Sequence, residues 1–166
     1  QKFCGECGAP LRDGAGTAER KYISALFCDV VGSTALGETL DPEHVALVMD
    51  EYVGLCRDVI EGYGGVIQKV IGDAVVAIFG VPVVHEDDPE RAVRAALRIL
   101  DRLQASDLSL QVRIGVQTGE ALVRPDVDPH SGASFATGDC LNTASRLQAV
   151  APVGASRISS SVRPDD

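Results

Sequence analysis

Residues 66–79 read VIQKVIGDAVVAIF, which is two apolar runs separated only by Gly72 and Asp73. Runs rich in β-branched residues favour extended strands, and a Gly-Asp pair between two such runs is typical of a tight hairpin turn. The stretch therefore predicts two antiparallel strands, over residues 66–71 and 74–79. It decides the fold, because the segments on either side must then pack around a sheet.

Helical patterns flank this hairpin on both sides. Before it, Asp-Pro-Glu at residues 41–43 supplies an N-cap, a proline at the first helical position and an acid in the first turn. Apolar residues then recur at helical spacing until a cluster of glycines at residues 62–65. After the hairpin, residues 88–104 carry an apolar face of the same period. A short apolar run over residues 22–29 predicts a buried strand.

The remaining segments continue this alternation. We expect strands over residues 110–116 and 120–123 with a turn at Thr118-Gly119, a polar loop over 125–134, a third helix from about 137 to 151, and a weak strand over 156–162. The order is β-α-β-β-α-β-β-α-β, and its first six elements are the ferredoxin-like βαββαβ arrangement. The predicted class is therefore α+β, with a ferredoxin-like core whose helices pack on one face of an antiparallel sheet, plus extra strands and a late helix.

Charge excludes several kinds of partner. The chain has 166 residues, enough for one cored domain, and a formal net charge of −9. Proteins that bind nucleic acids or anionic membrane surfaces concentrate Lys and Arg, and no such block is present. A nucleotide remains compatible with this charge, because metal ions and local backbone amides can offset its phosphates.

The apolar and cysteine patterns are typical of a cytoplasmic protein. The longest nearly apolar stretch, residues 74–84, is too short to cross a bilayer. Cys28, Cys56 and Cys140 each lie within an apolar or helical pattern, where a free cysteine usually behaves as a small buried hydrophobe. We therefore expect a reducing compartment and no disulfide framework.

The first candidate site is the segment DVVGST at residues 29–34. Its Asp29 ends the predicted strand, and a loop containing a glycine follows. Such a loop can direct backbone N–H groups at phosphate oxygens while the carboxylate holds a hard metal ion. An aspartate that merely turns the end of a strand fits the same spacing, so both interpretations stay open here.

The second candidate site is the turn of the hairpin. Gly-Asp is ordinary turn chemistry when considered alone. Together with Asp29, however, Asp73 gives the pair of carboxylates that two divalent ions require. Lys69 lies four residues earlier in an apolar run, where a solvated lysine is unfavourable unless it faces a site or an edge.

The third candidate site is the segment GDCLNTASRL at residues 138–147. Asn142 and Arg146 are four residues apart and therefore lie on one face of the predicted helix. An amide and a guanidinium placed in this way can orient a ribose and neutralise phosphate charge in a transition state. An ordinary helix with a polar stripe is the alternative interpretation.

In this order the three motifs resemble the class III adenylyl and guanylyl cyclase family. The family's Asp-x-x-Gly-x-Thr loop matches residues 29–34, and its Lys four positions before a second metal Asp matches residues 69–73. Its Asn-x-x-x-Arg matches residues 142–146, and residues 113–119 look like the strand and turn that precede that helix. The resemblance spans residues 20–162 and implies conversion of ATP to 3′,5′-cyclic AMP and pyrophosphate at a homodimer interface.

The resemblance also implies a role for each matching residue. Two Mg²⁺ or Mn²⁺ ions would be bound by two carboxylates and one backbone carbonyl: Asp29, Asp73 and Val30. Backbone amides around the loop would hold the phosphates: Gly32, Ser33 and Thr34. Lys69 would bond the purine, Asn142 would position the ribose, and Arg146 would stabilise the pentavalent phosphorus. In the family the metal-binding aspartates come from one chain and the last three residues from the other.

Two features depart from the family pattern. The adenine-selecting position, usually Asp, lies seven residues before the Asn and is Phe135 here, whose side chain offers no hydrogen bond. Base selection would then rest on Lys69, on backbone groups and on a shifted neighbour such as Thr137. Lys69 still favours ATP, because guanylyl cyclases of the family usually carry Glu there. Family domains also continue with further strands, so residues 21–166 read as a catalytic domain truncated at its C-terminus.

Residues 1–20 read as a separate piece. Cys4 and Cys7 resemble half of a zinc ribbon, but four ligands are needed and no second pair follows. A vestigial knuckle and linker is favoured over a zinc ion shared between two chains.

Two functions are compatible with these motifs. An active adenylyl cyclase in signal transduction, fused to or regulated by other domains, explains the complete set of motif residues. A catalytically weak domain that binds nucleotide or dimerises is the alternative, and Phe135 is the feature that favours it. An RNA-binding module is excluded by the acidic charge and by strands that lack aromatic residues.

Overall fold

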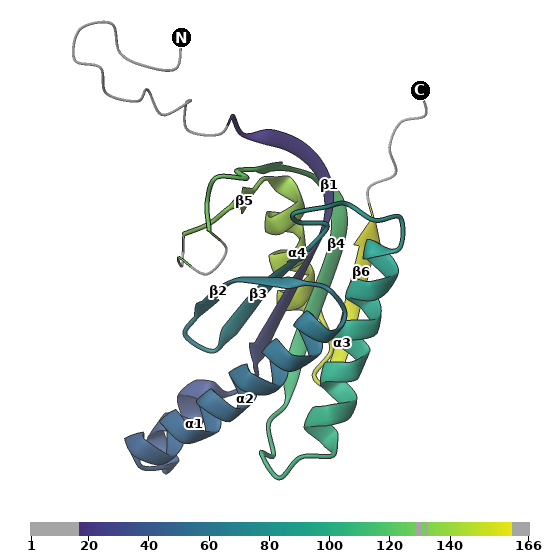
Figure 1. Ribbon diagram of the computed structural model, residues 1–166. Helices are drawn as coiled ribbons and strands as arrows, with labels where there is room; N and C mark the ends of the chain where they lie inside the picture. Colours follow the sequence, from purple (N-terminus) through teal and green to yellow (C-terminus); the bar gives the residue numbers. More distant parts are fainter. Residues whose placement is uncertain (1–16, 129–130, 132, 161–166) are drawn as a thin grey trace, which may run out of the picture.

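The computed structural model describes residues 17–128, 131 and 133–160, and Figure 1 shows their arrangement. The elements in chain order are β1 (Glu19–Val30), α1 (Ser33–Thr39), α2 (Pro42–Gly62), β2 (Val66–Ile71), β3 (Ala74–Phe79), α3 (Asp88–Gln104), β4 (Val112–Val123), β5 (Ala136–Thr137), α4 (Asp139–Val150) and β6 (Ala155–Ser160). The predicted α+β class with a βαββαβ core is confirmed.

The sheet has the order β2-β3-β1-β4, and both β5 and β6 pair with β4. Strand β1 is central and runs antiparallel to both of its neighbours, β3 and β4. The added strand β6 runs parallel to β4, and β5 runs antiparallel to it. The first four strands therefore have the order of a ferredoxin-like sheet, extended beyond β4.

Helices cover both faces of this sheet (Figure 1). Side chains alternate along β1, so Leu26 and Cys28 join the core beneath α2 and α3, whereas Ile23 and Ala25 join a second core beneath α4. The two helices of the predicted ferredoxin-like core, α2 and α3, lie on one face, as expected. Helix α4 packs on the opposite face, and it is this placement that creates the cavity described below.

One predicted turn is absent, because residues 112–123 form a single strand. β4 pairs with β1 residue by residue, from Val112 opposite Val30 to Val123 opposite Glu19. At the expected turn, the Thr118 hydroxyl lies 2.7 Å from the buried hydroxyl of Ser24 across the two strands. The long partner strand thus overrides the local turn preference of Thr-Gly.

The cysteines are buried as expected. Cys28, Cys56 and Cys140 are free thiols inside the two cores. Burial raises the pKa of the Cys140 thiol to about 11, which keeps it protonated near neutral pH. In the part of the chain that the structure describes, no helix is both long and apolar enough to span a membrane.

Candidate active site

The fold brings the two predicted metal-binding carboxylates together. Asp29 ends β1, and Asp73 lies in the turn between β2 and β3. Because β1 and β3 are antiparallel and Cys28 pairs with Val75, the end of β1 lies beside the turn that precedes β3. Burial raises the pKa of the Asp29 carboxyl, and the charge of Asp73 together with a hydrogen bond to it raises this pKa further. The two carboxylates therefore interact directly.

Asp29 accepts hydrogen bonds, and Arg113 of β4 lies opposite it in the β1–β4 register. Gln148 Nε2 donates to Asp29 Oδ2 at 3.4 Å, and the backbone N–H of Val30 also donates to this carboxylate. Neither carboxylate of the pair forms a salt bridge with a residue in the described ranges. Two adjacent carboxylates that form no salt bridge among the described residues fit a divalent cation with a preference for oxygen ligands.

The protein alone does not complete a metal coordination shell. Among the described residues no group of three or more His, Cys, Asp and Glu side chains is placed to hold an ion. Mg²⁺ commonly takes only one or two carboxylates and fills its remaining positions with water and substrate phosphates. The Asp29–Asp73 pair has that character.

The segment after Asp29 turns sharply into a short helix. Gly32 has φ +74°, a left-handed conformation that only glycine adopts without strain. Its carbonyl accepts from the N–H of Ala35 at 3.0 Å, and α1 begins at Ser33. The first N–H groups of a helix have no acceptor within that helix. The amides of Ser33 and Thr34 therefore have no acceptor within α1.

A cavity of about 270 Å³ lies on the α4 side of the sheet. It is bounded by β2, by the segment leading into β5, and by the first turns of α4. Three predicted site residues line it, each from a different element: Lys69, Thr137 and Asn142. Lys69 Nζ donates to the hydroxyl of Ser134 at 3.4 Å, so this bond joins β2 to the segment 134–137. Ser134 was not among the predicted site residues.

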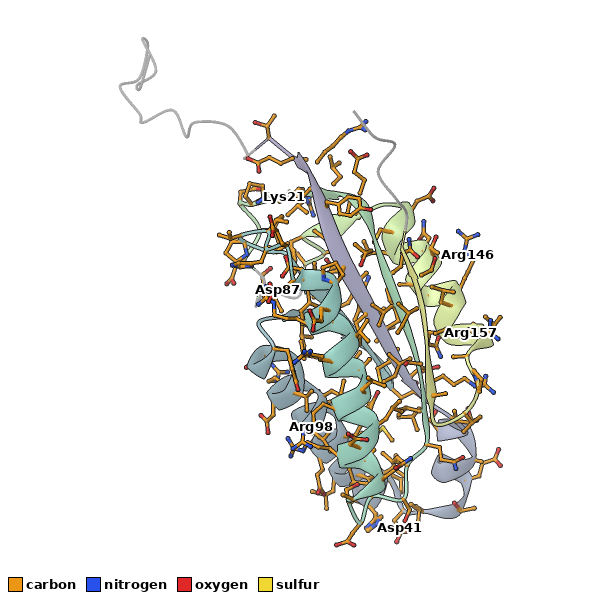
Figure 2. All side chains as sticks on the ribbon, turned by 90° about the vertical axis from the view of Figure 1, so that its right-hand side faces the viewer. Lys21, Asp41, Asp87, Arg98, Arg146 and Arg157 are labelled. Carbon is orange, nitrogen blue, oxygen red and sulfur yellow. The ribbon has the colours of Figure 1, made fainter. Side chains whose placement is uncertain are left out.

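Arg146 lies outside this cavity. Its Nε donates to the backbone carbonyl of Asn142 one turn earlier at 3.4 Å. The side chain is exposed, and Figure 2 shows it projecting from α4 toward the outside of the molecule. The helix therefore directs Asn142 into the cavity and leaves Arg146 free to meet a group from another molecule.

Comparison with known proteins identifies the family. The sequence profile described as "Adenylate and Guanylate cyclase catalytic domain" matches residues 17–164. The chain belongs to this family. Adenylate cyclase 1 of Rhizobium meliloti (strain 1021) is 32% identical over 143 residues, which cover 81% of this chain. The match spans 22% of that relative's length and 14% of another's, so this cyclase domain corresponds to part of much longer proteins.

Solved structures of cyclases have the same fold. The adenylyl cyclase CyaB from P. aeruginosa is 27% identical with a TM-score of 0.75, covering 86% of this chain and 78% of that chain. The guanylyl cyclase Cya2 is 30% identical with a TM-score of 0.72, covering 86% of this chain and 77% of that chain. Relatives of both nucleotide specificities are thus similarly close.

One predicted base contact is not met in this cyclase domain. Phe135 is 1% exposed and packs in the core beneath α4 with Ile23 and Val123. Its side chain does not line the cavity, although it occupies the family's base-selecting position. The carbonyl of Phe135 accepts from the backbone N–H of Arg124 at 2.7 Å, and the phenyl ring is buried in this core. The possible zinc ligands Cys4 and Cys7 lie outside the described residues.

Sequence reasoning also missed residues that hold site groups in place through hydrogen bonds. Gln148 bonds Asp29, and Gln68 accepts the backbone N–H of Ala136 through its Oε1 at 2.8 Å. Gln68 is 2% exposed. A buried glutamine next to Lys69 in an apolar run was the available signal, because a buried amide normally requires a specific partner.

Proposed function

We propose that this domain is an adenylyl cyclase, which forms 3′,5′-cyclic AMP and pyrophosphate from ATP at a site shared by two copies of the chain. The observation that carries the proposal is the position of Lys69, whose ammonium group lies in a cavity that Asn142 also lines. An ammonium group only donates hydrogen bonds. It suits the N1 acceptor of adenine, whereas guanine carries a donor at N1.

The specificities of the relatives alone do not indicate whether this domain uses ATP or GTP. One relative at 32% identity is an adenylate cyclase, and one solved relative at 30% identity is a guanylyl cyclase. The proposal of ATP as substrate therefore rests on Lys69 and on the residues around it.

The reaction would use two regions of the site, the carboxylate pair with its following loop and the cavity beside α4. The ribose 3′-oxygen forms a bond to the α-phosphorus, the bond from that phosphorus to its bridging oxygen breaks, pyrophosphate leaves, and the hydroxyl proton passes to solvent. Asp29 and Asp73 would hold Mg²⁺ or Mn²⁺, which supplies positive charge to the triphosphate and the 3′-oxygen when bound. The amides of Ser33 and Thr34 would bind phosphate oxygens on the same side.

The partner copy would supply the remaining groups. Lys69 would hold the base and Asn142 would orient the ribose from one copy, opposite the carboxylates of the other. Arg146 would stabilise charge on the phosphorus as the bonds exchange. Its exposure on α4, away from its own chain's cavity, supports a role across an interface.

The alternative function, a catalytically weak nucleotide-binding or dimerisation domain, was favoured by Phe135. Because Ser134 places a hydroxyl beside Lys69, the cavity has polar groups at this position, and Phe135 no longer favours the alternative. The length of the relatives supports fusion to further domains, and the buried free thiols support a cytoplasmic location.

The test is product formation by the full chain with ATP or GTP, in Mn²⁺ and in Mg²⁺. We expect cyclic AMP as the main product, with the rate dependent on the divalent ion. Nucleotide binding without any cyclic product would support the alternative function instead.

A further inference from the structure

Three backbone groups of the segment that bounds the cavity opposite Lys69 already form hydrogen bonds within the protein. The N–H of Ala136 bonds the Gln68 side chain at 2.8 Å. The carbonyl of Ser134 accepts from Arg124 Nη2 at 2.7 Å, and the carbonyl of Phe135 accepts from the Arg124 N–H at 2.7 Å. The hydroxyl side chains of this segment are therefore better placed than these three groups to contact a bound base.

Two hydroxyls remain on this segment, Ser134 and Thr137. Ser134 is partly buried, and its Oγ is 3.4 Å from Lys69 Nζ. Thr137 is exposed and lies between this cavity and a second hollow bordered by Arg20 and Glu120. Ser134 is thus the hydroxyl that acts at the same place as Lys69.

We propose that Ser134 reads the purine together with Lys69, in place of the residue at the family's position, and that Gln68 positions it. The inference rests on the proposed function. It names a base-contacting residue one position earlier than the family pattern, because the ring of Phe135 is turned into the core.

A bulge in β2 explains how Gln68 and Lys69 act together. The β2–β3 register shifts between Ile67, opposite Ala77, and Lys69, opposite Val76. Successive side chains of a regular strand point to opposite faces, but here both Gln68 and Lys69 line the cavity. The extra residue of a bulge re-aims its neighbours in this way. Gln68 can therefore fix the 134–136 backbone while Lys69 reaches the hydroxyl of Ser134.

The two polar groups complement adenine better than guanine. Lys69 can only donate, whereas a serine hydroxyl both donates and accepts. Adenine presents an acceptor at N1 beside a donor amino group at C6, which matches Lys69 and the Ser134 oxygen. Guanine presents one acceptor, O6, beside two donors, N1–H and the amino group. In the orientation that adenine takes, the guanine N1–H donor would face the Lys69 ammonium group, so guanine cannot adopt this orientation and does not gain the contact with Ser134.

The test compares kcat/KM for ATP and for GTP in the full chain with Mn²⁺. We expect Ser134→Ala to lower the ratio of the ATP value to the GTP value by about fivefold to tenfold, the effect of losing one hydrogen bond. Thr137→Val tests the other hydroxyl on the cavity wall. Ser106→Ala, which removes a part-buried hydroxyl outside the cavity, is the matched control and should leave the ratio unchanged. An unchanged ratio in Ser134→Ala, or a fall only in Thr137→Val, overturns the inference.

The role of Gln68 is tested by a pair of variants. Gln68→Leu removes the acceptor for the Ala136 N–H and should lower the same ratio, whereas Gln68→Glu keeps an acceptor oxygen and should retain it. A purely structural role would lower the melting temperature without changing the ratio, and that result overturns the positioning role.

A binding measurement separates this inference from the proposed function. Displacement of the fluorescent analogue MANT-ATP by ATP and by GTP, in Ca²⁺, gives a ratio of affinities that needs no turnover. If the wild-type chain makes no cyclic nucleotide, the proposed activity is wrong, and this ratio decides the inference. A ratio that falls about fivefold or more in Ser134→Ala supports it, and an equal ratio in both chains overturns it.

Discussion

Gln148 of α4 donates a hydrogen bond from its Nε2 to Oδ2 of Asp29 at 3.4 Å. Asp29 lies near the end of β1, and Gln148 lies two residues beyond Arg146 on the helix that also carries Asn142. The bond joins the strand of the carboxylate pair to the helix of the nucleotide-contacting residues. A displacement of α4 would therefore disturb both regions of the site.

Gly115 sets how closely α4 packs on the sheet. A Cβ at this position would overlap the carbonyl oxygen of Ala144 and the backbone nitrogen of Gln148, neither of which can rotate aside. Gly115→Ala should lower the free energy of unfolding by about 1–3 kcal/mol, measured by urea denaturation, and reduce cyclic nucleotide formation.

The matched control is Gly54→Ala in α2, where no atom lies within 4 Å of an added Cβ. This change should stabilise the helix by about 0.5–1 kcal/mol, because glycine is unfavourable within helices. Equal stability of Gly115→Ala and the wild type would show that α4 can move away at no cost.

Both carboxylates should be required for activity. Asp29→Ala and Asp73→Ala each remove an oxygen ligand from a site whose catalysis is mainly electrostatic, so the rate should fall about 100-fold or more. Circular dichroism should show that both variants fold. Asp50→Ala, which removes an exposed carboxylate from α2, is the control and should retain its activity. Near wild-type turnover in either site variant would contradict the metal assignment.

The carboxylate pair should also give a dependence of stability on pH in the absence of metal. The pKa of Asp29 is raised above its ordinary 3.8, by burial first and then by Asp73. A raised carboxyl pKa means that the folded state binds the proton more tightly, so stability is lost as the pH rises from below 3.8 through the folded-state pKa.

Asp73→Asn removes part of this effect. At pH 7 without metal, the variant should melt about 1–2 °C above the wild type, and this difference should disappear below about pH 3.5. Added Mn²⁺ should raise the melting temperature of the wild type more than that of the variant. A variant that is less stable than the wild type at pH 7 would show that the two carboxylates do not repel each other.

The sequence predicted elements whose patterns are local. The hairpin strands 66–71 and 74–79 and the helix 88–104 have the bounds expected, because each is an unbroken periodic run between strong turn or cap residues. The apparent turn at Thr118-Gly119 was wrong, because pairing with a strand distant in sequence decides that position. The short helix α1 and the two-residue strand β5 likewise depend on tertiary contacts.

The site was predictable where the chemistry follows from residue type and fold order. Asp29 and Asp73 lie close together because the C-terminal end of β1 lies beside the turn between β2 and β3. The bulge at Gln68 could not be predicted because it is a property of pairing with β3, and the inward direction of Phe135 could not be predicted because it depends on packing beneath α4. Ser134 was consequently not predicted as a site residue, although it is adjacent to Phe135 at the family's base-selecting position.

Lys69 should control which base is used. Lys69→Glu replaces a group that donates to adenine N1 with one that accepts from the N1–H and amino group of guanine. Steady-state rates with the two nucleotides should show the ratio of ATP use to GTP use falling about 10-fold or more. Lys21→Glu, a change at a lysine outside the cavity, is the control for altered charge. An unaltered ratio would mean that other groups read the base.

The central claim, a site completed by two copies of the chain, is tested most directly by complementation. Asp73→Ala and Arg146→Ala proteins should each be nearly inactive alone. In a mixed dimer one site carries both lesions and the other carries neither, so an equimolar mixture that exchanges subunits should recover up to about a quarter of wild-type cyclic AMP production. No recovery, with subunit exchange demonstrated independently, would contradict the shared site and place all catalytic groups within a single chain.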